Sequence, residues 1–335
     1  MSAQIKPRTG SAYARVLGFG GYRPARVVTN EEICQNIDSS DEWIQARSGI
    51  VTRRWANNEE TVQAMSVAAA GKALANSGVR VDQIGAVIVS TVSHLYQTPA
   101  IATAIAEELG AKGAAAFDIS AACAGFCYGV GLADGMVRTG SAEHVIVIGV
   151  ERLSDLTDPH DRSTAFLFAD GAGAAVIGPS DEPGVGPVIW GSDGAQAGLI
   201  SQEESWHQAF HSDGGADWPH LRMEGNPVFR WAVWEMARVA EQALAAAGVT
   251  AAELDAFIPH QANMRITDAM VKALKLPANV RVARDIAQQG NTSAASIPLA
   301  IERMLETGEV KSGETALIIG FGAGLAYAAQ VIRLP

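Results

Sequence analysis

The sequence predicts an α/β protein in which two similar halves together form a five-layer α/β/α/β/α arrangement. Three observations predict it. Short aliphatic runs alternate with alanine-rich helical segments, which indicates mostly parallel sheets with helices on both faces. The two halves also repeat one another in sequence. Finally, a length of 335 residues suits two units of roughly 150 residues each, which we expect at 1–185 and 186–335.

The internal repeat rests on three matched segments that occur in the same order. The pairs are 73–93 with 243–263, 143–149 with 314–320, and GAGAAVIG at 171 with GAGLAYAA at 322. Their offsets are 170, 171 and 151. Because insertions collect in loops, the fall in offset predicts about 20 extra residues between 150 and 170 of the first half.

Helices are predicted where alanine-rich stretches end at a glycine, and strands where aliphatic residues run without interruption. In the first half we expect a helix at 64–77, strands at 86–91 and 115–119, a helix at 124–138, and strands at 144–149 and 173–177. In the second half we expect a helix at 232–247 and a strand at 256–259. The stretch 193–225, rich in Gly, Asp and His, is expected to be an exposed loop.

Composition excludes several functional classes. A net charge of −11 and a pI near 5.1 argue against binding of nucleic acid or anionic membranes, which needs a broad basic surface. Three cysteines without a C-x-x-C pair fit neither a disulfide framework nor a zinc site. The first residues lack the apolar stretch of a signal peptide, and the aliphatic runs are too short to span a bilayer. We therefore expect a soluble, cytoplasmic protein.

Glycine-rich stretches and loop histidines are expected to be structural. GFGG at 18–21, DGAGA at 170–174 and GFGAG at 320–324 lack the strand–GxGxxG–helix context of a dinucleotide site. We interpret the last two as tight turns, of which GFGAG can lend backbone N–H groups to a site. Three histidines come without a carboxylate pattern, so no metal site is expected at them. They are His207, His211 and His220.

Cys123 is the strongest candidate for a nucleophile. In DISAACAGF at 118–126 a strand ends at Ile119, small residues make a turn, and the cysteine stands where a helix begins. The free N–H groups and the dipole of a helix start lower the pKa of a thiol and favour the reactive thiolate. The N–H of Cys123 can also help to hold an oxyanion. A cysteine among alanines is as often a small buried apolar residue, which is our interpretation of Cys34 and Cys127.

Two further motifs offer polar groups for the same chemistry. In FIPHQANMRI, His260 follows the C-terminal end of a strand, where the active sites of α/β proteins gather. In QQGNTSAAS, Asn291 lies two positions from 293, the residue that an offset of 170 pairs with Cys123. His260 can instead be a core or loop histidine with one backbone hydrogen bond, and Asn291 or Thr292 merely a helix N-cap.

Pseudo-symmetry would bring the three side chains together, because equivalent helix starts of the two halves would face each other. A cysteine with a histidine is the usual pairing for a mechanism through an acylated thiol. An asparagine amide cannot ionise and can only donate or accept hydrogen bonds, which suits an enolate-like charge better than the activation of water. We therefore expect Cys123, His260 and Asn291 to form one site.

At these residues the chain closely resembles β-ketoacyl-[acyl-carrier-protein] synthase III, the initiating condensing enzyme of type II fatty acid synthesis in the thiolase superfamily. The resemblance covers nearly the whole chain and implies a thiolase-like fold. Its motifs are SSDEWI at 39–44, RSGI at 47–50, AACAGF at 121–126, DGAGAAV at 170–176, PHQAN at 259–263, GNTSAAS at 290–296 and GFGAG at 320–324. The Cys, His and Asn set separates this family from elongating synthases, which use two histidines, and from thiolases, which use a second cysteine.

The resemblance implies a decarboxylative Claisen condensation. Cys123 would take the acyl group of an acyl-CoA as a thioester. His260 and Asn291 would bind the malonyl thioester of acyl carrier protein, promote decarboxylation and stabilise the enolate, giving β-ketoacyl-carrier protein, CoA and CO2. The N–H groups of Cys123 and Ala323 would hold the oxyanion of acyl transfer. The CoA thioester is a substrate, and no other cofactor is expected.

The resemblance also implies residues that bind CoA. Trp43 would stack on the adenine, Arg47 and Arg162 would line the nucleotide and phosphate end, and Asn263 would contact the pantetheine arm. Other interpretations remain for two of them. Trp43 can anchor an amphipathic helix, and Arg162, which lies in the expected insertion, can be an ordinary surface charge.

Two macromolecular partners are implied, an acidic carrier protein and a second copy of this chain. Carrier-protein binding needs a local basic patch, for which Arg265 and Lys272 are candidates. In the family a residue of the dimer partner closes the acyl pocket, and members that prefer acetyl groups carry Phe there. Thr98 matches that position, so short branched starters are expected, although Tyr96 is an alternative pocket wall.

Two other functions remain open at this point. One is a priming ketosynthase of a type II polyketide pathway, with the same chemistry but a different starter and carrier. The other is a thiolase-fold acyltransferase or partner subunit that does not condense. A degenerate subunit should have lost its cysteine, so the presence of Cys123, His260 and Asn291 favours condensation.

Overall fold

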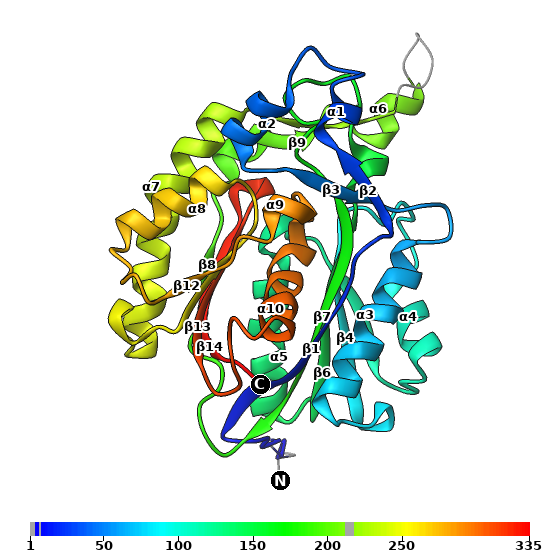
Figure 1. Cartoon of the computed structure of the whole chain (residues 1–335). Coiled ribbons are helices and arrows are strands. Elements are labelled where there is room, and N and C mark those ends of the chain that lie inside the picture. Colours follow the sequence, from blue (N-terminus) through cyan, green and yellow to red (C-terminus); the bar gives the residue numbers. More distant parts are fainter. Residues whose placement is uncertain (1–3, 7, 212–217) are drawn as a thin grey trace.

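The computed structural model describes residues 4–6, 8–211 and 218–335, which contain two five-stranded sheets with matching strand order. The first sheet, in the order β1-β7-β6-β4-β5, consists of Tyr13–Tyr22, Asp170–Ser180, His144–Arg152, Ile84–Ser90 and Ala115–Ile119. The second, in the order β8-β14-β13-β11-β12, consists of Ile189–Gly191, Tyr327–Arg333, Thr315–Phe321, Ala256–Pro259 and Arg281–Val282. The chain passes from one sheet to the other between β7 and β8, the connection in which the boundary at 185 was expected (Figure 1).

Each sheet is mostly parallel, with one reversed strand. β4, β5 and β6 pair in parallel, whereas β7 is antiparallel to both β1 and β6. The second sheet repeats this pattern, with β14 antiparallel to both β13 and β8. The reversal has a simple cause, since β7 and β14 return to their sheets without the crossover helix that a parallel neighbour needs.

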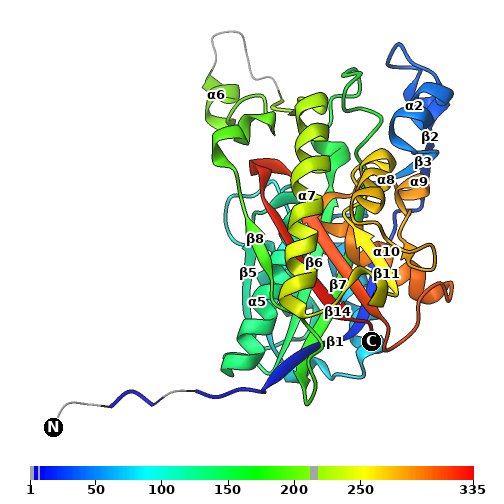
Figure 2. The ribbon, with the colours of Figure 1, turned by 90° about the vertical axis from the view of Figure 1, so that its left-hand side faces the viewer.

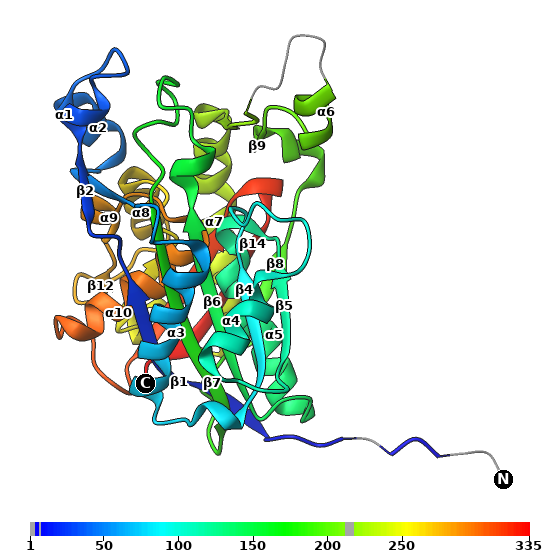
Figure 3. The ribbon, with the colours of Figure 1, turned by 90° about the vertical axis from the view of Figure 1, so that its right-hand side faces the viewer.

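Helices cover both faces of both sheets and confirm the five predicted layers. The long helices α3, α4, α5, α7, α8 and α10 are Val62–Ser77, Ile101–Leu109, Gly125–Thr139, Gly225–Ala247, Met264–Ala273 and Ser296–Glu306. α5 and α10 lie between the sheets, in a core cluster that includes strand residues of both (Figure 1). α7 and α8 cover the outer face of the second sheet, and α3 and α4 that of the first (Figures 2 and 3).

Small elements gather near one end of the sheets, around the segment that carries Trp43. They are β2 (Arg26–Thr29), α1 (Asn30–Ile33), α2 (Asp41–Ser48), β3 (Thr52–Trp55) and α9 (Ile286–Gln289). α2 begins at a Ser40 cap, whose hydroxyl accepts the Trp43 N–H at 3.2 Å. The helix ends at Gly49, which has a left-handed φ of 80°. These caps place Trp43 and Arg47 on one short, well-defined helix.

The stretch 193–225 contains more structure than the loop predicted from its composition. Its elements are a turn at Gly194–Leu199, β9 (Ile200–Gln202), α6 (Trp206–His211) and β10 (Leu221–Met223). α7 also begins at Gly225, seven residues before the predicted 232. Aromatic contacts that composition does not reveal support this region, for example Trp206 edge-on to Trp218 with 5.0 Å between ring centroids. Residues 212–217 of the stretch lie outside the described part.

The starts of α5 and α10 are related residue by residue. Each follows a 3-10 turn, Ala122–Ala124 in one half and Ser293–Ala295 in the other. The first residue of each turn has a left-handed φ, 44° at Ala122 and 48° at Ser293. The offset here is therefore 171, and the residue equivalent to Cys123 is Ala294 rather than 293. The change from 170 means that the second half has gained one residue after β11.

The DGAGA stretch is a strand, and the prediction of a tight turn there is wrong. β7 begins at Asp170, so these glycines lie in the sheet. A Cβ on Gly173 would lie 2.6 Å from Cγ of Pro298, and one on Gly149 of β6 would lie 2.1 Å from the Ala294 carbonyl oxygen. The glycines thus let α10 and its preceding turn pack directly on the first sheet.

Candidate active site

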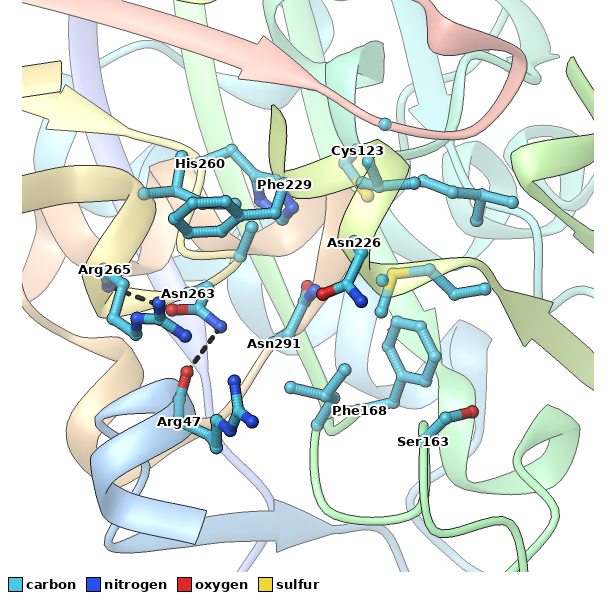
Figure 4. Close-up of a pocket in the computed structure, with 18 of the residues that line it drawn as sticks. Arg47, Cys123, Ser163, Phe168, Asn226, Phe229, His260, Asn263, Arg265 and Asn291 are labelled. Carbon is cyan, nitrogen blue, oxygen red and sulfur yellow. Dashed lines mark hydrogen bonds between the residues drawn. The ribbon is translucent and has the colours of Figure 1, made fainter. Parts of the chain in front are cut away.

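Two cavities meet at Cys123. The first, of about 310 Å³, leads from the exposed Arg47 and Arg265 to the buried His260 and Asn291 and is called here the entry cavity (Figure 4). The second, of about 880 Å³, is called the far cavity. Its large apolar lining residues include Leu95, Tyr96, Leu153, Trp206, Phe210 and Trp218. Cys123 lines both, so a group bound to its sulfur can extend into the far cavity while the entry cavity empties.

Burial dominates the acidity of the Cys123 thiol. Both cavities reach the residue, which is half-buried, but packed protein atoms surround the sulfur. This desolvation raises the pKa of Cys123 to about 12, and it outweighs the Ser293 hydroxyl and the N–H groups of Cys123 and Ala323, which each lower the pKa. The expectation of a low thiol pKa is therefore wrong for the resting protein. The helix start is present, but removal of water from the thiolate costs more than the helix start supplies.

The GFGAG loop closes around the cysteine. β13 ends at Phe321, and a Cβ on Gly322 would lie only 2.7 Å from Sγ of Cys123. A Cβ on Gly320 would lie 2.8 Å from the carbonyl oxygen of Cys123. Glycine at both positions allows this approach, which brings the Ala323 N–H to the sulfur. The two N–H groups expected to hold an oxyanion, those of Cys123 and Ala323, thus act on the same atom.

His260 is held as a neutral hydrogen-bond donor. It follows β11, and its Nδ1 lies 2.7 Å from the Ser296 hydroxyl. That hydroxyl accepts the Gln261 N–H at 3.3 Å, which leaves its own hydrogen free for Nδ1 and so favours the tautomer with hydrogen on Nε2. Burial lowers the pKa of His260 to about 3, so the imidazole stays uncharged at neutral pH.

Asn291 offers the donor end of its amide to the entry cavity. Its Oδ1 accepts the Ser293 N–H at 2.9 Å, and an N–H can bond only to the amide oxygen, which fixes the amide orientation. The backbone is tied to the first half, since the Asn291 N–H donates to Leu167 O and its carbonyl accepts from Ala169, both at 2.9 Å. The loop between β6 and β7, where the sequence predicts an insertion, therefore positions Asn291. The entry cavity brings Cys123, His260 and Asn291 together as predicted.

Ser296 is a site residue that sequence reasoning missed. The repeat contains a signal for it, because the offset of 171 pairs Ser296 with Gly125 and the offset of 170 pairs His260 with Ser90. In the first half a Cβ on Gly125 would lie 1.7 Å from the Ser90 hydroxyl, so the two positions touch there as well. The contact between Ser296 and His260 in the second half therefore corresponds to the contact between Gly125 and Ser90 in the first half.

Three of the four residues expected at CoA, Trp43, Arg47 and Asn263, line the entry cavity, and the fourth, Arg162, lies over one of them. The guanidinium carbons of Arg162 and Arg47 lie over the Trp43 ring, 4.6 and 5.6 Å from its centroid. Asn263 caps α8 by accepting the Arg265 N–H at 2.9 Å, and its amide donates to Arg47 O at 2.9 Å (Figure 4). Within the described ranges none of these three arginines forms a salt bridge, so their charges remain available for an anionic ligand.

The remaining predicted positions are exposed. Arg265 lies at the cavity mouth over the Phe229 ring, 5.0 Å from its centroid, whereas Lys272 lies further along α8 and does not line the cavity. Thr98 is exposed and lines neither cavity of its own chain, while Tyr96 of the same loop lines the far cavity. The role of Thr98 as a pocket wall therefore depends on a second subunit.

The described ranges hold no group of three or more His, Cys, Asp or Glu side chains arranged to bind a metal ion. None of their helices combines the length and the apolar character that a membrane span requires.

Comparisons with known proteins agree with this geometry. Two family models match, 3-oxoacyl-[acyl-carrier-protein] synthase III at 117–194 and its C-terminal model at 244–334. A β-ketoacyl-[acyl-carrier-protein] synthase III of Streptomyces glaucescens is 66% identical over 99% of this chain and 100% of its own length. The priming β-ketosynthase of the R1128 polyketide pathway has a TM-score of 0.96 and 48% identity, over 100% of this chain and 99% of its own. The corresponding synthase III of Aquifex aeolicus has a TM-score of 0.88 and 37% identity, over 96% and 99%.

Proposed function

The chain belongs to the β-ketoacyl-[acyl-carrier-protein] synthase III family, and we propose that Cys123, His260 and Asn291 perform its initiating condensation between an acyl-CoA and malonyl-acyl carrier protein. One observation carries the assignment of roles. A neutral histidine and an oriented asparagine amide provide two donors in the cavity that leads to a cysteine. Two such donors can stabilise a developing enolate without protonating it.

The first half-reaction transfers the acyl group. Sγ of Cys123 attacks the thioester carbon of acyl-CoA, and the N–H groups of Cys123 and Ala323 stabilise the oxyanion of the tetrahedral intermediate. The bond from carbon to the CoA sulfur then breaks. CoA leaves as a thiol with the proton that Sγ has lost, so charge and atoms balance.

The second half-reaction forms the carbon–carbon bond. The carbonyl oxygen of the malonyl thioester accepts hydrogen bonds from His260 Nε2 and Asn291 Nδ2. The bond to the carboxylate breaks, CO2 leaves, and the electron pair becomes the enolate. Its carbon attacks the acyl carbon on Cys123, whose bond to Sγ breaks, and the released thiolate takes up one proton from water. The product is β-ketoacyl-acyl carrier protein.

Cys123 should be the acylated residue. Incubation with acetyl- or isobutyryl-CoA is expected to add one acyl group by intact-mass measurement, and Cys123→Ala should show none. Cys127 serves as the internal control, because it is fully buried and lines neither the entry cavity nor the far cavity. A label on Cys34 or Cys127 in peptide mapping would refute the assignment.

The partners follow from the same proposal. CoA phosphates and adenine would bind at Arg47, Arg162 and Trp43, with Asn263 near the pantetheine arm, and no cofactor beyond the CoA substrate is required. The acidic carrier protein would dock beside the entry cavity at Arg265, with Lys272 as a second contact. The protein would act as a homodimer in the cytoplasm, where its three unpaired cysteines stay reduced.

Short branched acyl-CoA should be used at least as well as acetyl-CoA. The far cavity gives an acyl group on Cys123 apolar surroundings, and each buried CH₂ contributes roughly 0.8 kcal/mol, or about fourfold in affinity. The loop at 93–100 would reach the partner's cavity through Thr98, and Thr98→Phe should shift preference toward acetyl-CoA. Steady-state kinetics on an acyl-CoA panel test this, with Tyr96→Phe as a control that keeps the ring. An unchanged profile in Thr98→Phe would contradict the assignment.

A second function shares this chemistry. The TM-score of 0.96 to a priming β-ketosynthase of a polyketide pathway favours a priming role as the alternative. The two functions differ in the carrier protein that receives the product. Measuring kcat/KM with malonyl groups on a fatty-acid carrier and on a polyketide carrier distinguishes them.

A further inference from the structure

A buried carboxylate lies behind the nucleophile, and the mechanism above assigns it no role. Glu151, near the end of β6, is fully buried. Its Oε2 accepts the Val92 N–H at 3.1 Å, the Ser93 hydroxyl at 2.7 Å and the Thr91 hydroxyl at 3.4 Å. Its Oε1 has no hydrogen-bond partner in the part of the chain that the structure describes. An unpaired buried oxygen is rare enough to need an explanation.

Ser293 connects this carboxylate to the nucleophile. The turn Ser293–Ala295 packs against β6, which carries Glu151, and against the turn Ala122–Ala124, which carries Cys123. Gly149, on the same face of β6 as Glu151, lies directly against Ala294 of that turn. The Ser293 hydroxyl also lowers the pKa of both Cys123 and Glu151. Yet the Ser293 oxygen makes no hydrogen bond of standard geometry within the described residues. The residue is buried, lines the far cavity beside Cys123, and has a left-handed φ of 48°, a conformation that a serine rarely adopts. Of the two residues with an unsatisfied oxygen, Ser293 thus lies beside Cys123, and Glu151 lies on the strand against which the Ser293 turn packs.

The reaction needs a proton acceptor that His260 does not supply. The Cys123 thiol is protonated at rest and must lose its proton as it attacks. His260 is bound through Nδ1 to Ser296 and presents a donor at Nε2, so it suits the enolate step rather than proton removal. Among the groups that shift the pKa of Cys123, Glu151 is the one carboxylate, and its charge raises that pKa.

We propose that Ser293 and Glu151 together accept the proton of Cys123 during acyl transfer, an inference that rests on the function proposed above. The proton moves from Sγ to the Ser293 oxygen while the Ser293 proton moves to Oε1 of Glu151. The bond from Sγ to the acyl carbon forms and the bond to the CoA sulfur breaks. Reverse transfer along the same hydroxyl returns the proton to the leaving CoA sulfur. Glu151 acts only through Ser293 and does not touch substrate.

The surroundings of Glu151 determine the pH at which this relay works. The groups that face it are the hydroxyls of Thr91, Ser93 and Ser293, the Val92 N–H and the thiol of Cys123. The neighbouring Arg152 instead pairs with Asp155 at 3.0 Å. Burial raises the pKa of Glu151 to about 7. The ionised acceptor therefore forms as pH rises through neutrality, and the rate of acyl transfer should rise with it.

The test is the rate of single-turnover acylation of Cys123 by acyl-CoA, followed by quenched-flow mass spectrometry between about pH 5.5 and about pH 9. The wild type should show a rise through about pH 7. Glu151→Gln, which keeps an acceptor for the Val92 N–H, and Ser293→Ala should each lose this rise and react roughly 10²-fold more slowly at pH 8. The double variant should be no slower than either single variant. Ser93→Ala removes a bond that lowers the Glu151 pKa, so its rise should move to higher pH.

Ser90→Ala is the matched control, because Ser90 is another buried serine whose hydroxyl lacks a partner within the described residues. It should keep the wild-type pH profile. A relay is overturned if Ser293→Ala retains the rise near pH 7, or if Glu151→Gln slows acylation equally at every pH. If Glu151→Gln fails to fold by circular dichroism, Ser293→Ala and the shift in Ser93→Ala decide the question. A wild type that does not acylate at Cys123 would instead overturn the proposed function.

Discussion

His260→Ala should lose condensation while it retains acyl transfer to Cys123. In the proposed mechanism the histidine supplies one of two donors to the malonyl carbonyl, and removal of one such donor costs roughly 10²-fold or more in rate. Acyl transfer is proposed to rely on the N–H groups of Cys123 and Ala323, which the substitution leaves in place. Release of ¹⁴CO2 from malonyl-carrier protein measures decarboxylation, and intact mass measures acyl transfer to Cys123.

Two related variants sharpen this experiment. Asn291→Ala should match the decarboxylation loss of His260→Ala, since it removes the other donor. Ser296→Ala keeps the imidazole ring but removes its 2.7 Å hydrogen bond to Ser296, so a smaller loss of decarboxylation is expected. Burial lowers the pKa of His260 to about 3, so decarboxylation should show no step near the ordinary histidine pKa. Equal losses in both half-reactions of His260→Ala would contradict this division of roles.

Gly322→Ala should nearly abolish acylation of Cys123 without unfolding the protein. Its Cβ would lie 2.7 Å from Sγ, closer than any ordinary contact, so either the sulfur or the GFGAG loop must move. Movement of the loop also withdraws the Ala323 N–H, and loss of one oxyanion donor alone costs roughly 10²-fold. Acylation by intact mass and melting by calorimetry separate the local effect from a general one.

Gly198→Ala is the control for this glycine. Gly198 lies in the turn at Gly194–Leu199, has no left-handed φ, and has open space where a Cβ would be placed. Near wild-type acylation is expected from it. Rapid acylation of Gly322→Ala would show that the loop is not required at the sulfur.

The fold was predictable because its signals are local. The alanine-rich helices that end at Gly78 and Gly248, and the aliphatic strands, are recognised from neighbouring residues in the chain. The internal repeat is recognised from a nearly constant offset. The candidate site was predictable for a related reason, since His260 and Cys123 each lie in the turn that follows a strand. The short strand β12 and the hairpin of β9 and β10 gave no comparable local pattern.

What could not be predicted depends on burial and on contacts between distant segments. The pKa of Cys123 follows from the atoms that surround the sulfur, and these come from Gly322 and Ser293 as well as from its own helix. The local rule about helix starts therefore gave the wrong direction. Glu151 and Ser293 are separated by more than a hundred residues, and an ordinary strand sequence gives Glu151 no distinguishing mark.

The route by which substrates reach Cys123 has a kinetic consequence. In the proposed mechanism both substrates carry their thioester at the tip of a pantetheine arm, and both reach the one Cys123 sulfur through the entry cavity. The enzyme must therefore alternate between a free and an acylated form, which is ping-pong turnover with parallel double-reciprocal lines. Released CoA and incoming carrier protein compete for the same vacated channel. We therefore expect a high ratio of free CoA to acyl-CoA in the cell to slow the start of new chains.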